Sequence, residues 1–203
     1  MAGVPDIRIR PANDARVNSR GSYVLYWMAA ARRAHYNFAL DRAVEYAAEL
    51  QKPLVVIETI FSGLRWDCER FHKFALDGVA DNVSAFEKTP AVYEAFVEGK
   101  RGEAETLIVK AVAKAAVVVA DEFPCGEYPA MLSRAAEKTG VLVEAVDSNG
   151  LLPLRAAERV FSTAYSFRRF LQKVLRENLP FAPRAMPLAA AKIPPAGKIA
   201  AAV

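Results

Sequence analysis

The stretch Tyr23-Val24-Leu25-Tyr26-Trp27-Met28 is a short, continuous run of apolar residues that follows Arg20-Gly21-Ser22. An apolar run of this length beside turn residues is typical of a strand buried on both faces of a sheet. A second such run, Leu54–Ile60 (LVVIETI), follows, and apolar residues between the two recur at three- and four-residue spacings. This spacing predicts a helix within residues 29–50, so the two runs form a βαβ unit.

The same alternation continues along the chain. Further apolar, β-rich runs predict strands at residues 92–98, 117–120 and 141–146. Helical patterns lie between the strands, at residues 71–87, 103–114 and 129–138. Parallel strands joined by crossover helices on both faces satisfy this order. The predicted fold class is therefore α/β, with a doubly wound, mostly parallel, five-stranded sheet of Rossmann-like type.

The composition indicates one domain followed by a short extension. A chain of 203 residues with 53% hydrophobic residues can bury one substantial core. The last predicted helix covers about residues 164–178, with Ser162 or Thr163 available as its N-cap. We predict an α/β domain over residues 1–180. Residues 181–203 are rich in alanine and proline without apolar periodicity, so we expect a linker or tail that does not pack.

Several classes of protein are disfavoured. No apolar run approaches the roughly 20 residues that span a bilayer, and Asp6, Arg8 and Arg10 interrupt any signal-peptide core. We therefore expect a cytoplasmic protein without a membrane partner. Two cysteines and two histidines, widely spaced, predict no metal site.

The charge distribution leaves two interpretations open. The formal net charge is only +4, but residues 155–184 carry seven basic residues against two acidic ones. This basic segment is either a solvated helix face or a surface for a partner.

Candidate site residues follow from the expected sheet, because ligands of open parallel sheets bind at the carboxyl ends of the strands. Met28 ends the first predicted strand and Arg32 follows it, just inside the next helix. Asp121, Glu122 and Phe123 follow the fourth strand. Apolar and aromatic surface beside a few polar groups suits a flat, hydrogen-bonding chromophore. The two acids have an alternative role as structural loop residues, and Arg32 has one as an ion-pair partner.

Other site chemistries find little support. No strand-to-helix junction carries a glycine-rich phosphate loop, which disfavours phosphate-centred nucleotide binding. No nucleophile lies beside a histidine base at a strand end, so we predict no catalytic residues.

Five segments resemble the class II photolyases. The run YVLYWM is followed by Arg32 and by Asn37-x-Ala39-Leu40, which resembles the opening signature of that family. Residues 65–78 (RWDCERFHKFALDG) resemble its R-H-x-F-x-L-x-G helix, here with Phe71 between the arginine and the histidine. Residues 117–121 and 146–150 match its later strand ends, and residues 164–171 its closing helix. The resemblance covers about residues 16–188.

The resemblance implies the N-terminal antenna domain of a light-driven cyclobutane pyrimidine dimer (deoxyribodipyrimidine) photolyase. In some members of that family the domain holds a light-harvesting antenna, a deazaflavin or a folate, and other members carry none. A separate helical domain binds FAD and the DNA lesion. We expect that second domain to be missing from this chain, so that FAD and damaged DNA are reached only through an FAD-binding photolyase domain, fused or separate. We do not expect this chain alone to catalyse repair.

Two alternatives remain. One is a stand-alone nucleotide-binding or stress-type protein with the same fold, and the other is a non-catalytic interaction module that uses the basic final helix.

Overall fold

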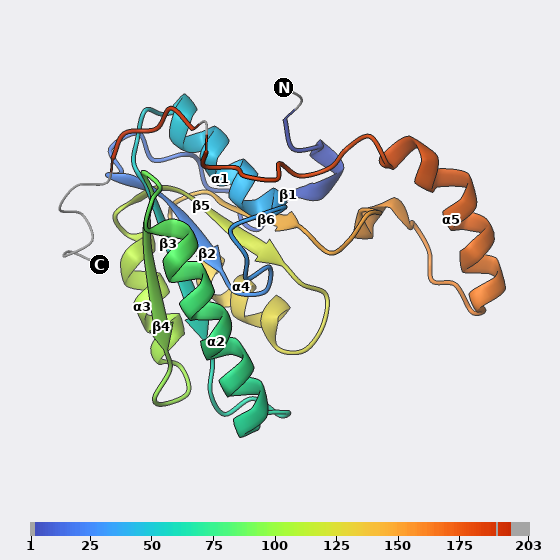
Figure 1. Ribbon diagram of the computed structural model, residues 1–203, viewed down its shortest axis with the longest axis horizontal. Helices are drawn as coiled ribbons and strands as arrows, with labels where there is room; N and C mark the ends of the chain where they lie inside the picture. Colours follow the sequence, from blue (N-terminus) through green and yellow to red (C-terminus); the bar gives the residue numbers. More distant parts are fainter. Residues whose placement is uncertain (1–2, 190, 196–203) are drawn as a thin grey trace.

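The computed structural model describes residues 3–189 and 191–195. A six-stranded sheet forms the centre, in the order β1-β6-β5-β2-β3-β4 (Figure 1). The strands are β1 Ile9–Pro11, β2 Tyr23–Met28, β3 Leu54–Ile60, β4 Val92–Val97, β5 Ala115–Glu122 and β6 Val143–Asp147. The α-helices are α1 Phe38–Glu49, α2 Glu69–Phe86, α3 Glu103–Val112, α4 Tyr128–Glu137 and α5 Ala164–Asn178. Two short 3₁₀ helices, η1 Asp6–Arg8 and η2 Leu154–Ala156, complete the elements.

The α/β class and the five parallel strands are confirmed, but the predicted strand count is wrong. A sixth strand, β1, pairs antiparallel with β6, with Ile9 opposite Val146. β1 has only three residues, and Arg10 and Pro11 are exposed. A strand this short and this exposed has no apolar pattern, so only pairing along the free edge of β6 reveals it.

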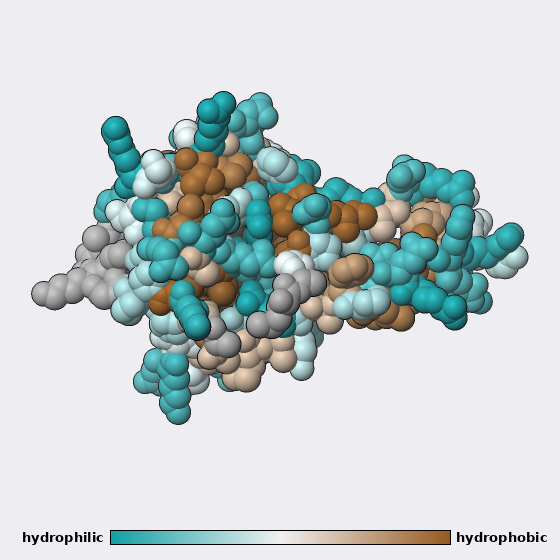
Figure 2. All heavy atoms as spheres, turned by 90° about the horizontal axis from the view of Figure 1, so that it is seen from above, coloured by the Kyte–Doolittle hydropathy of each residue, from teal (hydrophilic) through white to brown (hydrophobic). Residues whose placement is uncertain are grey.

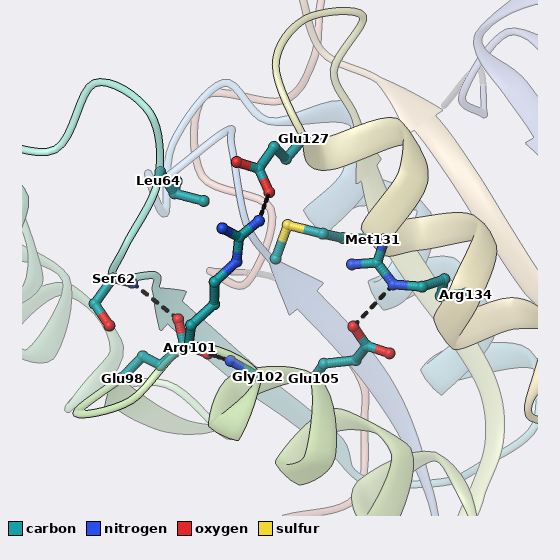
Figure 3. A pocket seen from close by; sticks show the side chains of 9 residues that line it. All are labelled: Ser62, Leu64, Glu98, Arg101, Gly102, Glu105, Glu127, Met131 and Arg134. Carbon is teal, nitrogen blue, oxygen red and sulfur yellow. Dashed lines mark hydrogen bonds and ion pairs between the residues drawn. The ribbon is translucent and has the colours of Figure 1, made fainter.

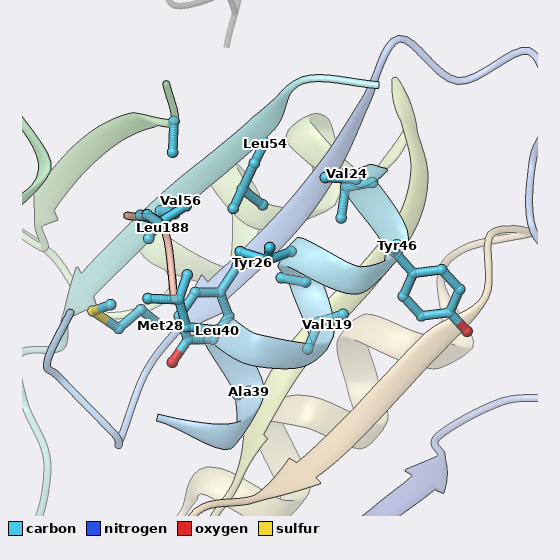
Figure 4. Packing of buried hydrophobic residues seen from close by; sticks show 14 of the residues in the cluster. Val24, Tyr26, Met28, Ala39, Leu40, Tyr46, Leu54, Val56, Val119 and Leu188 are labelled. Atoms are coloured by element: carbon cyan, nitrogen blue, oxygen red, sulfur yellow. The ribbon is translucent and has the colours of Figure 1, made fainter. Parts of the chain in front are cut away.

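The core has two layers, one on each face of the sheet. Alternate residues of β2 point to opposite faces, as a strand requires. Val24, Tyr26 and Met28 pack with α1, as Figure 4 shows for Tyr26, Ala39 and Leu40. The intervening residues of β2 pack with α3 and α4 on the other face. Because β2 is buried on both faces, its sequence is apolar throughout.

The first crossover begins later than the sequence predicts. Residues 29–37 form an irregular loop, and α1 starts at Phe38. Asn37 caps the helix, since its side-chain oxygen accepts a hydrogen bond from the backbone N–H of Leu40 at 3.1 Å. Arg32 therefore lies in the loop and not in the helix.

The segment after α5 returns to the domain. Leu188 and Ile193 are buried in the core layer beside α1. The Arg184 side chain donates from Nε to Oδ1 of Asp41 at 2.6 Å. The expectation that this segment does not pack is thus wrong at Arg184, Leu188 and Ile193, while Phe181 and Met186 are exposed. Two isolated apolar residues carry no period, so sequence alone does not reveal the contact. Residues 190 and 196–203 lie outside the described part, and the division at residue 180 stays a prediction.

Helix α5 stands apart from the sheet (Figure 1), and none of its residues is buried. Thr163, one of the two residues predicted as its N-cap, caps the helix by accepting a hydrogen bond from the Ser166 N–H at 3.2 Å. Phe161 packs on this helix, with its ring centroid 4.9 Å from that of Phe170. Figure 2 shows this end of the molecule as a lobe where hydrophilic and hydrophobic side chains lie together.

Candidate functional site

A cavity of about 330 Å³ lies at the carboxyl end of β5, between α4 and η2. We call it the β5–α4 cavity. Its lining residues come from β1, from the end of β5 and the loop after it, from α4, and from the segment around η2. They are Arg10, Asp121, Glu122, Phe123, Pro124, Tyr128, Pro129, Leu132, Leu154, Arg155 and Ala157. Its volume is within the range of sites for small organic ligands.

One part of the lining is aromatic and apolar. The rings of Phe123 and Tyr128 meet edge to face, with centroids 5.6 Å apart. Tyr128 makes a second edge-to-face contact with the buried Phe61, also at 5.6 Å. These contacts hold the two aromatic side chains in place, and Leu132 and Leu154 add aliphatic surface. Such a wall can remove a planar ring from water at little entropic cost.

The polar part of the lining is a triad of charges. Glu122 accepts a hydrogen bond at Oε1 from Arg10 Nε at 3.0 Å. Its other oxygen, Oε2, pairs with Nη1 of Arg155. Arg155 also donates from Nε to the carbonyl of Ile7 at 3.0 Å. Its remaining nitrogen, Nη2, has no hydrogen-bond partner among the described residues. The Arg10–Glu122–Arg155 triad thus carries a net positive charge, and the unpaired Arg155 Nη2 is itself buried.

Asp121 has a different task, although it adjoins the cavity. Its Oδ2 accepts hydrogen bonds from the backbone N–H groups of Ala29, Ala30 and Ala31, at 2.8 to 2.9 Å. Its Oδ1 accepts one from the Tyr26 hydroxyl at 2.8 Å. Burial raises the pKa of Asp121 above its usual range, while these hydrogen bonds pull the pKa back down. The carboxylate therefore holds the loop after β2.

The structure does not bring Met28 and Arg32 to this cavity. Met28 is fully buried in the core layer beside α1. Arg32 donates from Nη2 to the carbonyl of Thr59 at 2.7 Å, and its Nε lies 3.9 Å from Oε1 of the buried Glu58. Of the five predicted site residues, only Asp121 and Glu122, which end β5, and Phe123, which follows it, line the cavity.

Sequence reasoning missed Arg10, Tyr128, Leu132, Leu154 and Arg155 as site residues. Arg155 belongs to the basic segment, but charge alone does not say which surface it reaches. Arg10 lies on the unpredicted strand β1. Tyr128 and Leu132 carry the ordinary signal of a helix face that packs on the sheet.

A second, smaller pocket of about 120 Å³ lies between α3 and α4 (Figure 3). Its charged side chains already pair with one another, Arg101 with Glu127 and Arg134 with Glu105. Glu98 accepts the backbone N–H of Ser62 at 2.9 Å. Because these groups are satisfied internally, the pocket offers a ligand less than the β5–α4 cavity does.

The described residues bear on two further classes of function. None of their helices is long and apolar enough to cross a bilayer. Within the same residues, no group of three or more histidine, cysteine, aspartate or glutamate side chains is placed to hold a metal ion.

Comparison with known proteins points to one group of enzymes. No family model matches the chain. The deoxyribodipyrimidine photo-lyase of Methanothermobacter thermautotrophicus is 30% identical over 169 residues, which make up 83% of this chain and 37% of that protein. This chain is homologous to the N-terminal domain of photolyases. It spans little more than a third of the length of that curated relative.

A solved photolyase structure supports the fold. An archaeal photolyase from Sulfolobus tokodaii, crystallised with two FAD molecules, superposes with a TM-score of 0.58 at 15% identity. The match covers 79% of this chain and 36% of that one. A universal stress protein in complex with cAMP reaches a TM-score of only 0.38 at 17% identity, over 63% of this chain and 99% of that one, which is too low to indicate a common fold.

Proposed function

We propose that this chain is the antenna domain of a class II-type deoxyribodipyrimidine photolyase and that the β5–α4 cavity holds its light-harvesting chromophore, a deazaflavin or a folate. The observation that carries the proposal is a cavity of about 330 Å³ at a strand end in a chain homologous to the photolyase N-terminal domain. The Sulfolobus structure has been interpreted as implying a novel light-harvesting cofactor.

The residues of the cavity fit such a group. A planar chromophore needs apolar walls that exclude water and polar groups that fix its edge. Phe123 and Tyr128 supply the first, and the Arg10–Glu122–Arg155 triad supplies the second. When bound, the chromophore would supply light absorption. The protein holds the ring in one orientation and keeps it dry.

The flavin belongs to a partner in this proposal. The photolyase relative is much longer than this chain, and we assign FAD and contact with damaged DNA to an FAD-binding domain, fused or separate. Helix α5 supports such a partner, because its apolar stripe, which includes Phe170, Leu171 and Val174, has no buried residue. We expect this chain to carry no stoichiometric FAD and to perform no repair by itself.

The nucleotide-binding alternative loses support from the loop after β2. In a nucleotide-binding protein of this architecture, N–H groups at that loop receive phosphate oxygens. Here the N–H groups of Ala29, Ala30 and Ala31 are occupied by the Asp121 carboxylate. A phosphate at this position would meet a negative charge.

Titration of the purified chain with deazariboflavin and with methenyltetrahydrofolate, followed by fluorescence, tests the proposal. We expect at least one of them to bind. Leu154→Trp fills part of the cavity and should weaken binding about tenfold or more. Leu151→Trp is the matched control, since Leu151 is 69% exposed and does not line the cavity. If neither chromophore binds, or if both variants behave alike, the proposal is wrong.

A further inference from the structure

We infer that the basic face of helix α5 binds the phosphate backbone of duplex DNA, without regard to sequence or damage. Three side chains define this face: Arg169, Lys173 and Arg176. Its charge points to a polyanion, and the choice of DNA rests on the proposed function, which places this chain in a DNA-repair enzyme. The inference goes beyond that function, because it gives this chain a DNA contact of its own.

The three cations lie on one side of α5. Lys173 and Arg176 follow Arg169 by four and seven residues, a spacing that puts all three on the same helix face. All three residues are exposed. None of them forms an ion pair among the described residues, not even with Glu177, the one acidic residue of α5. The face is therefore a row of cations that is open to a partner.

Cations of the sheet domain, by contrast, include several that pair with carboxylates. Arg42 pairs with Glu144, and Arg134 and Lys138 both pair with Glu105. Residues 155–184 hold seven of the 27 basic residues but only two of the 23 acidic ones, so the rest of the chain is close to neutral. The net positive charge of the chain thus gathers in the segment that contains α5.

The spacing of the basic face suits the phosphates of a DNA strand. An α-helix rises about 1.5 Å per residue, so Lys173 and Arg176 lie about 6 Å and 10.5 Å along the axis from Arg169. Phosphates of one strand recur about every 3.4 Å along the duplex axis, so second and third neighbours lie about 6.8 Å and 10.2 Å away. A helix that lies along the duplex can therefore bring each cation to a phosphate.

The apolar side of α5 argues against a membrane surface as the partner. An amphipathic helix that binds a bilayer inserts its apolar side. Here the ring of Phe161 packs on that side, with its centroid 5.4 Å from that of Phe167 and 4.9 Å from that of Phe170. The residues of the basic face are exposed, and Figure 2 shows hydrophilic side chains along the outer end of this lobe. Charge is thus the freely available part of α5.

Binding through this face should depend steeply on salt. A cation that neutralises a phosphate releases a counterion, so the logarithm of the binding constant falls against the logarithm of the salt concentration. The slope is about −0.9 per contact, so three contacts predict a slope of about −2.7. Affinity should then fall about 80-fold between about 20 and 100 mM salt.

Fluorescence anisotropy of a labelled duplex of about 20 base pairs, titrated with the full chain at about 20 mM salt, tests the inference. Duplexes with and without a pyrimidine dimer should bind equally within about twofold, because the backbone is the same. Combined substitution of Arg169→Gln, Lys173→Gln and Arg176→Gln should weaken binding at least about tenfold and bring the salt slope near zero. If circular dichroism shows that this variant does not fold, Lys173→Gln alone should reduce the steepness of the slope by about one.

Two matched variants control for net charge and for charge-independent effects. Combined substitution of Arg20→Gln, Lys88→Gln and Lys100→Gln removes the same charge from three exposed positions outside α5, and it should weaken binding less than about threefold. Arg169→Lys with Arg176→Lys keeps the charges of the basic face and should keep the wild-type salt slope.

The outcomes separate this inference from the proposed function. The inference is wrong if the wild type does not bind the duplex at about 20 mM salt, or if the two triple variants weaken binding equally. It is also wrong if phosphatidylserine vesicles or polyglutamate bind the wild type as tightly as the duplex does. Chromophore titration uses the β5–α4 cavity and not α5, so either proposal can fail while the other is supported. A steep salt slope that is lost only when the charges of the basic face are removed supports the inference.

Discussion

The Asp121 carboxylate should stabilise the fold through the loop after β2, and Asp121→Ala tests this. The substitution removes the acceptor for three backbone N–H groups and for the Tyr26 hydroxyl. Ala29 and Ala31 are buried, at 6% and 8% exposed, so water does not readily replace the acceptor. Each buried N–H left without a partner costs about 1–3 kcal/mol, or about 2–6 kcal/mol for the two.

Burial of the carboxylate reduces the expected loss. Desolvation raises the pKa of Asp121, which shows that the charged form is held at some cost in the folded protein. We therefore expect Asp121→Ala to lower the free energy of unfolding by an amount in the lower part of this range, about 2–4 kcal/mol. A typical domain is stable by only about 5–15 kcal/mol, so the change is large enough to measure with confidence.

Urea unfolding followed by tryptophan fluorescence measures the change, since Trp27 is 3% exposed in the core. The midpoint should fall while the slope stays the same. Glu122→Ala, at the next position, removes only partly exposed ion pairs and should cost less than about 1 kcal/mol. Asp121→Asn keeps one carbonyl oxygen, so its loss of unfolding free energy should lie between those of Asp121→Ala and Glu122→Ala. A loss below about 1 kcal/mol for Asp121→Ala would refute the assignment of the loop to this carboxylate.

Two further predictions concern packing and pH. Leu188→Ala should lower the free energy of unfolding by about 2–5 kcal/mol, because Leu188 is buried. Leu179→Ala, at a half-exposed position, should lower it by less than about 0.5 kcal/mol. Equal losses of unfolding free energy for the two variants, measured by urea unfolding, would contradict the packing of this segment. The hydrogen bond from Lys138 lowers the pKa of Glu105 below its ordinary 4.5, so this group stabilises the fold above that pH and the benefit is lost as pH falls through the lowered pKa. The stability difference between wild type and Glu105→Gln, measured in thermal melts, should therefore shrink below about pH 4.5. A stability difference that grows as the pH falls would contradict this prediction.

The elements of the fold are predictable where their signal is local. β2 and β3 are buried on both faces, so each appears as a continuous apolar run. Helix α5 begins and ends where its cap and its spacing predict, although it has no buried residue. The start of α1 is not predictable in this way, because the loop before it is held by Asp121, which lies about 90 residues further along the chain.

The candidate site is predictable only in part for the same reason. Asp121, Glu122 and Phe123 could be named because the end of a parallel strand is where ligands bind, and the strand itself is visible in the sequence. Which of the two acids pairs with other charged side chains of the cavity lining could not be named. The structure assigns Asp121 to the loop after β2 and leaves Glu122 with the two arginines.

The sequence by itself determined the class of fold, the order along the chain of the five parallel strands and their helices, and the kinship with photolyases. These follow from apolar runs, helical periods and signature motifs, which are all properties of neighbouring residues. The tertiary structure alone decided that Arg10 and Arg155 meet at Glu122, across 112 and 33 residues of chain. A charged residue that pairs across the fold leaves no periodic pattern in the sequence, and the register of the strands sets which residue it pairs with. The antiparallel pairing of β1 with β6 brings Arg10 to the end of β5, and no local pattern specifies that pairing.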